Sequence, residues 1–218
     1  MIKIIIVIAS RGADIDYRLA LNLARWCRDD KRVVDIVIQR NPFSAQEGQE
    51  AMLKDLEDKE FDYALVLDTD VWVELDAIDK LVDAGKDVCV APVWHYNWVE
   101  KDIQLNVHYE SILKRLYCAK TKGIEKIRSS SFACMMLSRK VFDAFKNAGE
   151  SYTTGGDPMD QVSDNVFYTK LHRLGLEAWV RWDIKTSHYP RVELCDETID
   201  HIIVRGILGR AGVEIEKA

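Results

Sequence analysis

Short apolar runs alternate with amphipathic stretches in the first half of the chain, and this alternation constrains the fold more than any other feature. Ile2 to Ala9 is rich in isoleucine and valine, which predicts a strand buried on both faces, as in a parallel sheet. Two more strands are predicted at Val33–Ile38 and Tyr63–Leu67, and a helix is expected after each strand. Such units connect with right-handed crossovers, so we expect an α/β domain with a mostly parallel central sheet flanked by helices.

The second half of the chain is less regular. An aromatic loop is predicted from Trp94 to Trp98, a buried strand from Ser130 to Leu137, and a mobile, glycine-containing loop from Glu150 to Asp160. A helix is expected from about Gln161 to Leu174, and a final helix near Thr198 to Leu208. Since no repeat or linker interrupts these elements, we expect a single domain.

The composition argues against several classes of partner. The 218 residues are 48% hydrophobic and 30% charged, which suits a globular domain with a sizeable core. The net charge is −6 and no basic block is present, so nucleic acid is not an expected partner. The apolar runs are too short to span a bilayer, and the five scattered cysteines match neither a disulfide framework nor a zinc site. We therefore expect a cytoplasmic protein without a membrane span.

Two carboxylates follow the third predicted strand, at Asp68 and Asp70. Ligands of open α/β sheets bind outside the carboxyl ends of the strands, so this is a candidate site. Close carboxylates repel each other unless a cation or proton lies between them, and their hard oxygens suit Mg²⁺ or Mn²⁺ together with diphosphate oxygens. A solvated pair of loop aspartates is the alternative. A phosphatase-like nucleophile fits less well, because Trp72 stands where such a motif has threonine.

Three other features could carry chemistry. Asp164 opens a predicted helix, where it is either a general base or simply favoured by the helix dipole. His188 follows a predicted strand and is either a metal ligand or a structural residue. Trp94 and Trp98 could stack on sugars or cover an edge of the core.

In their order and spacing these segments resemble the GT-A glycosyltransferases, in particular those similar to glycosyltransferase family 2. The resemblance implies a single GT-A-type domain with a nucleotide-sugar-binding half at 1–92, an acceptor-side half at 93–190, and a C-terminal helix and tail at 191–218. It rests on the segments Val7–Gly12, Phe61–Val73 with its Asp-x-Asp motif, Ser131–Phe142 and Ser163–Gly175, and on His188.

The resemblance also implies a function. A sugar would move from a UDP-, GDP- or TDP-linked donor to a glycan or other hydroxyl acceptor, with Mn²⁺ or Mg²⁺ as the cofactor. Asp70 would bind the metal, with His188 as a further ligand, and Asp68 would contact the ribose, or the metal through water. Ser10 and Arg11 would contact the nucleotide.

Asp164 would act as the general base, which implies inversion in one displacement. The family usually has glutamate where Ser163 stands and an aspartate where Gln39, Arg40 and Asn41 stand, so the sequence leaves open how this base is held. Two rival functions remain: a non-catalytic nucleotide-sugar- or carbohydrate-binding protein of the same fold, and a sugar-phosphate nucleotidyltransferase. The second has little support, since its glycine-rich, basic stretch is matched only by Ser10–Ala13.

Overall fold

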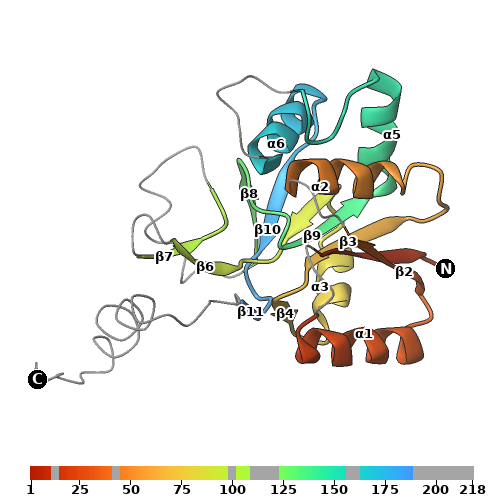
Figure 1. Cartoon of the computed structure of the whole chain (residues 1–218), viewed down its shortest axis with the longest axis vertical. Coiled ribbons are helices and arrows are strands. Elements are labelled where there is room, and N and C mark those ends of the chain that lie inside the picture. Colours follow the sequence, from red (N-terminus) through yellow and green to blue (C-terminus); the bar gives the residue numbers. More distant parts are fainter. Residues whose placement is uncertain (11–14, 41–44, 98–101, 109–122, 156–162, 189–218) are drawn as a thin grey trace, which may run out of the picture.

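The protein is a mixed α/β domain in which a seven-stranded sheet carries helices on both faces (Figure 1). A computed structural model describes residues 1–10, 15–40, 45–97, 102–108, 123–155 and 163–188. Its helices are α1 Tyr17–Asp29, α2 Ala45–Lys54, α3 Ala77–Asp83, α5 Arg139–Ala148 and α6 Ser163–Arg173. Its strands are β1 Ile4–Ser10, β2 Val33–Arg40, β3 Tyr63–Asp68, β4 Val71–Val73, β5 Val88–Val90, β6 Trp94–Asn97, β7 Asp102–Leu105, β8 Ile124–Ile127, β9 Cys134–Ser138, β10 Ala178–Arg181 and β11 Thr186–His188.

The central sheet is mostly parallel, as the alternation predicts. Its strand order is β2-β1-β3-β9-β5-β10-β8. Strands β2, β1, β3, β5 and β10 run in one direction, while β9 and β8 run in the other. Strand β9 lies between β3 and β5 and is antiparallel to both, so a strand from the second half of the chain is inserted into the first.

Side chains alternate across the sheet and divide the core into two parts. On β3, Ala64 and Val66 belong to one part, whereas Leu65 and Leu67 belong to the other. Helices α2, α5 and α6 cover the first face, and α1 and α3 cover the second (Figure 1). The strands are therefore buried on both faces, which explains their nearly continuous apolar sequences.

The start of α1 is joined to the turn that follows β3. The carboxylate of Asp16 caps the helix by accepting a hydrogen bond from the backbone N–H of Arg18, at 2.9 Å. The backbone N–H of Asp16 donates to the carbonyl oxygen of Thr69, at 2.8 Å. The first crossover helix thus holds the turn that contains Asp68 and Asp70.

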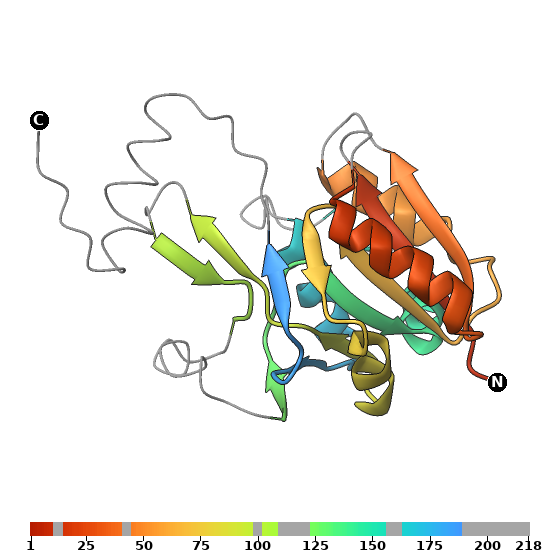
Figure 2. The same cartoon turned by 90° about the horizontal axis from the view of Figure 1, so that it is seen from below.

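The structure refines two predicted loops. The aromatic stretch that begins at Trp94 is a strand, β6, which pairs antiparallel with β7 in a hairpin that projects from the domain (Figure 2). The predicted loop at Glu150–Gly155 has no helix or strand, as expected, but it is packed into the core, because Tyr152 and Thr153 are fully buried. The predicted final helix lies outside the described residues. None of the helices in the described ranges is long and apolar enough to cross a membrane.

Candidate functional site

Two of the candidate residues, Ser10 and Asp68, end neighbouring parallel strands at the same edge of the sheet. Ser10 is the last residue of β1 and Asp68 the last residue of β3, and Asp68 pairs in register with Ala9. The Asp68 side chain is partly buried. Arg11 and Trp98 lie outside the described residues. This edge is where open α/β sheets bind ligands.

Asp70 and His188 are brought together by strand pairing. Asp70 lies between β3 and β4, and His188 is the last residue of β11, which pairs antiparallel with β4 so that His188 faces Val71. The Nε2 atom of His188 lies 3.3 Å from Oδ2 of Asp70, and the two side chains are 19% and 32% exposed. Two residues far apart in the sequence thus form a partly shielded carboxylate–imidazole pair. Strand β11 lies beside the hairpin β6–β7 (Figure 2).

The imidazole of His188 has acceptors on both sides. Its Nδ1 atom lies 3.2 Å from the carbonyl oxygen of Trp94. The pKa of His188 is raised, chiefly by the hydrogen bond with Asp70, although burial opposes this effect. The charge of Asp68 also raises the pKa, so a second carboxylate acts on the same ring.

The chemistry of this pair fits a divalent cation, although the pair is small. No group of three or more His, Cys, Asp and Glu side chains is arranged to hold a metal ion within the described part of the chain. Asp70 and His188 would supply one oxygen and one nitrogen ligand. Mg²⁺ and related ions at phosphate sites commonly take one or two protein carboxylates and complete their shell with water and phosphate oxygens. The pair therefore suits a cation whose remaining ligands come from water and from the phosphates of a nucleoside diphosphate.

Two sets of polar contacts hold the surroundings of His188. The hydroxyl of Thr186 donates to the carbonyl oxygen of Pro92, at 2.5 Å. The side chain of Asn106 is buried, accepts from the backbone N–H of Val93 at 2.8 Å, and donates to Oγ of Ser131 at 3.0 Å. These contacts join the hairpin β6–β7 to β11 and to the segment before β9. Nothing in the sequence marks Thr186 or Asn106, since each acts through residues distant in the chain.

Asp164 lies on α6, which covers the other face of the sheet from α1 and α3. It lies in the first turn of α6 and its side chain is partly buried. The helix packs in the core through Phe167, Tyr168 and Leu171, on the face covered by α2 and α5. Asp70 instead precedes β4 and His188 ends β11, and β4 packs against α1 on the opposite face.

Helix α6 is held by a group of buried charged side chains that we call the polar clamp, which consists of Lys170 on α6 and Glu50 on α2. Nζ of Lys170 donates to the carbonyl oxygen and to Oγ of Ser151, at 2.9 and 2.6 Å, and to the carbonyl oxygen of Thr154. Oε2 of Glu50 accepts from the backbone N–H of Thr153, at 2.6 Å. The clamp thus holds the segment Glu150–Gly155 between two helices.

The charges of the clamp are costly to bury. The residue Lys170 is only 4% exposed, and burial lowers the pKa of its ammonium group. The carboxylate of Glu150 lies 3.7 Å away and opposes this shift. Lys170 falls among apolar positions of α6, between Tyr168 and Leu171, and this is the signal by which the sequence could have revealed the clamp.

Comparisons with known proteins show a similarity of fold and do not identify a family. No protein-family model matches the chain, and no curated protein is similar to it in sequence. The crystal structure of A197 from STIV is similar with a TM-score of 0.56 and 14% identity, covering 87% of this chain and 86% of that one. A structure of GalNAc-T7 with UDP, GalNAc and Mn²⁺ has a TM-score of 0.49 and 14% identity, covering 88% of this chain. The chain spans 45% of the length of GalNAc-T7.

Proposed function

We propose that the protein is a metal-dependent glycosyltransferase that moves a sugar from a nucleotide-sugar donor to a hydroxyl acceptor. The observation that carries the proposal is the Asp70–His188 pair, on which Asp68 also acts, at the carboxyl edge of the sheet. The order and spacing of the sequence segments, which resemble GT-A glycosyltransferases, support the same conclusion.

The donor would bind at the ends of β1 and β3. Asp70 and His188 would hold Mn²⁺ or Mg²⁺, and Asp68 would contact the ribose, or the metal through water. Ser10 and Arg11 would contact the nucleotide. When bound, a divalent cation supplies positive charge that stabilises the departing diphosphate. The partly buried position of the pair strengthens such electrostatic interactions, because little water screens them.

The acceptor would react on the side of Asp164. Its carboxylate takes the proton of the acceptor hydroxyl, whose oxygen forms a bond to the anomeric carbon while the bond from that carbon to the diphosphate breaks. A single displacement of this kind inverts the anomeric centre. Trp94 is 44% exposed and its carbonyl contacts His188, so its ring, together with Trp98, is our candidate surface for stacking on a sugar.

A thermal-shift screen tests the donor site without a known acceptor. UDP, GDP, TDP, CMP and their sugar conjugates are added with and without Mn²⁺, because a ligand that binds only the folded state raises the melting temperature. We expect one nucleotide to raise it only when Mn²⁺ is present. Absence of any shift in folded protein would overturn the proposal. A metal-dependent shift without sugar release or transfer would instead identify a binding protein.

Two substitutions separate binding from chemistry. Asp70→Ala is expected to abolish the metal-dependent shift, whereas Asp164→Asn is expected to keep it and lose transfer. Asp29→Ala is the matched control, because the Asp29 side chain is 59% exposed and pairs only with the neighbouring Arg28 among the contacts described. Unchanged donor affinity in Asp70→Ala with Mn²⁺ contradicts the metal site, and near-normal transfer in Asp164→Asn contradicts the base.

A further inference from the structure

The two ring nitrogens of His188 face different groups. Nδ1 lies 3.2 Å from the carbonyl oxygen of Trp94, and Nε2 lies 3.3 Å from Oδ2 of Asp70. A carbonyl oxygen can only accept, so the first contact is a hydrogen bond when Nδ1 carries the hydrogen, which leaves Nε2 for a cation. Two ligands that each lie about 2.1 Å from one ion, in neighbouring positions, are about 3 Å apart. The separation of Nε2 and Oδ2 is close to this value.

The backbone just before Trp94 is held by the side chain of Asn106. Trp94 pairs with Leu105 in the hairpin β6–β7, so Val93 faces Asn106 at the base of the hairpin. The backbone N–H of Asn106 donates to the carbonyl oxygen of Val93, at 2.9 Å. The N–H of Val93 donates to Oδ1 of Asn106, at 2.8 Å, where a regular hydrogen-bonded pair would use the backbone carbonyl of residue 106. The amide side chain thus takes the place of a backbone acceptor.

Asn106 is itself fixed in one orientation. It is only 3% exposed, and its Nδ2 atom donates to Oγ of Ser131, at 3.0 Å. Because a backbone N–H can only donate, the oxygen of the amide faces Val93 and the nitrogen faces Ser131. Ser131 precedes β9, the strand that pairs with β3. Asn106 therefore ties the backbone that leads into Trp94 to the sheet that carries Asp68.

We propose that Asn106 is a positioning residue that directs Nε2 of His188 toward the cation beside Asp70. It acts by fixing the position of the Trp94 carbonyl oxygen, which accepts from Nδ1 and so sets the rotation of the ring. The inference rests on the proposed function, in which Asp70 and His188 hold the metal. Loss of a group that orients a ligating histidine weakens metal binding roughly 10–100-fold in other proteins.

A purely structural role of Asn106 leads to different expectations. The side chain would then only join the hairpin β6–β7 to the segment before β9. Its loss would lower the free energy of unfolding, because the buried N–H of Val93 would lack its acceptor. In the molecules that remain folded, the hydrogen on the ring of His188 and the affinity for metal would both be unchanged.

NMR tests the orientation of the ring without any metal. Two-bond ¹H–¹⁵N correlation spectra of the full chain show which nitrogen of His188 carries the hydrogen in alkaline solution, where the ring is neutral. Asp70 competes for this hydrogen, so Asp70→Ala is the starting variant. We expect the hydrogen on Nδ1 in Asp70→Ala, and a mixture of both forms when Asn106→Ala is added. Adding Asn106→Asp instead keeps an acceptor for Val93 and should preserve the Nδ1 form.

Two results of these spectra would overturn the inference, whatever the protein catalyses. The first is a hydrogen on Nε2 in Asp70→Ala, which would mean that the Trp94 carbonyl does not orient the ring. The second is an unchanged spectrum when Asn106→Ala is added, which would mean that Asn106 does not position this carbonyl.

Metal binding then tests the consequence. Mn²⁺ affinity is measured on the full chain by EPR, with and without UDP, and Asn106→Ala should lower it about tenfold or more. Glu50→Ala is the control for lost stability, because Glu50 lies on α2, which covers the other face of the sheet from α1 and β4, and this variant should bind Mn²⁺ as the wild type does. Ser131→Ala removes only the anchor of Asn106, so it should have a smaller effect in the same direction and disturb folding less.

The outcomes separate the inference from the function on which it rests. Unchanged Mn²⁺ affinity in both Asn106→Ala and Ser131→Ala overturns the positioning role, and Ser131→Ala alone decides it if Asn106→Ala does not fold. A wild-type chain that binds no Mn²⁺ refutes the proposed metal site instead. In that case the NMR spectra still decide whether Asn106 orients His188.

Discussion

The two sides of the candidate site are held in different ways. Asp70 and His188 are held mainly by backbone pairing between β4 and β11, with few side chains involved. Asp164 belongs to a helix that depends on packing and on the polar clamp of Lys170 and Glu50. Backbone pairing survives most single substitutions, whereas a buried charged side chain cannot be removed without leaving its partners unsatisfied. The side of Asp164 should therefore be the more fragile one.

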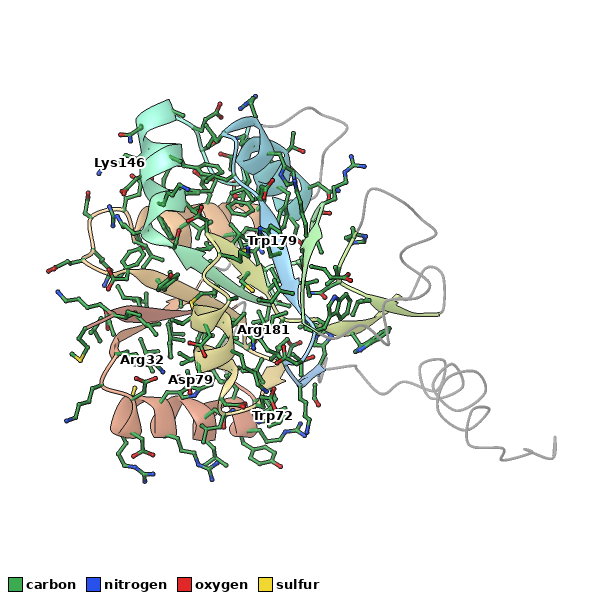
Figure 3. All side chains as sticks on the ribbon, turned by 180° about the vertical axis from the view of Figure 1, so that it is seen from behind. Arg32, Trp72, Asp79, Lys146, Trp179 and Arg181 are labelled. Carbon is green, nitrogen blue, oxygen red and sulfur yellow. The ribbon has the colours of Figure 1, made fainter. Side chains whose placement is uncertain are left out.

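Loss of Lys170 should have the largest effect on stability. Lys170→Met keeps the aliphatic stem but leaves the carbonyl oxygen of Ser151 without its donor and that of Thr154 with the Ser151 hydroxyl alone, so we expect a loss of about 3 kcal/mol in the free energy of unfolding. Urea denaturation measures it. Lys146→Met is the matched control, because Lys146 lies exposed on α5 and far from Trp72 on β4, the strand beside the candidate metal site (Figure 3). This substitution should change the free energy of unfolding by less than about 0.5 kcal/mol. An equal loss of unfolding free energy in Lys170→Met and Lys146→Met would show that the Asp164 side does not depend on the polar clamp.

Loss of Glu50 should have a smaller effect. Glu50→Ala removes the acceptor of the Thr153 backbone N–H and should cost about 2 kcal/mol by the same measurement. Glu60→Ala serves as the control, because the side chain of Glu60 is 87% exposed and pairs with Lys3 at the surface. A cost for Glu50→Ala no larger than that for Glu60→Ala would show that α2 contributes little to holding the segment Glu150–Gly155.

On the other side of the site, Thr186→Val should cost only about 1 kcal/mol, the value of one hydrogen bond to the Pro92 carbonyl oxygen. The pairing of β11 with β4 persists, so metal-dependent donor binding should be retained. Thr186→Ser keeps the hydroxyl and should behave like the wild type. A loss of several kcal/mol in Thr186→Val would mean that this side also depends on single side chains.

The smallest effect is expected at Asp16, and it depends on pH. The hydrogen bond with the Arg18 side chain lowers the pKa of Asp16 below its ordinary value of 3.8, although burial opposes it. The resulting stabilisation is present above pH 3.8 and is lost as the pH falls through the folded-state pKa. Asp16→Asn keeps an acceptor for the helix cap and should cost about 0.5 kcal/mol at pH 7. Urea denaturation at several pH values should show this difference vanish in acid, and a constant difference contradicts the assignment.

The fold could be predicted where burial on both faces produces long apolar runs. The strands at Ile4–Ser10, Val33–Arg40 and Tyr63–Asp68 lie where the sequence places them, to within a few residues. The insertion of β9 could not be predicted, because an apolar run carries no information about which strand it will pair with. Trp94 was misassigned to a loop because aromatic residues suit both exposed loops and strands.

The candidate site was only partly accessible from the sequence. The metal ligands, the base Asp164 and the nucleotide contacts stay predictions, although the structure does bring Asp70 and His188 into contact. The contacts of Lys170, Asn106 and Thr186 join segments that are distant in the chain. A single sequence does not encode such contacts in any local pattern, so they became visible only in the folded structure.

The pairing of β4 with β11 also has a consequence for synthesis. A chain emerges from the ribosome at about 5–20 residues per second, and contacts between distant residues form late because closing a long loop costs entropy first. Asp70 therefore emerges from the ribosome several seconds before His188 does, and the two residues can pair only after that. A chain interrupted just before β11 keeps nearly all of its central sheet and yet has no complete site. If Asp70 and His188 hold a metal as we propose, metal binding would distinguish the complete chain from a nascent one that is already largely folded.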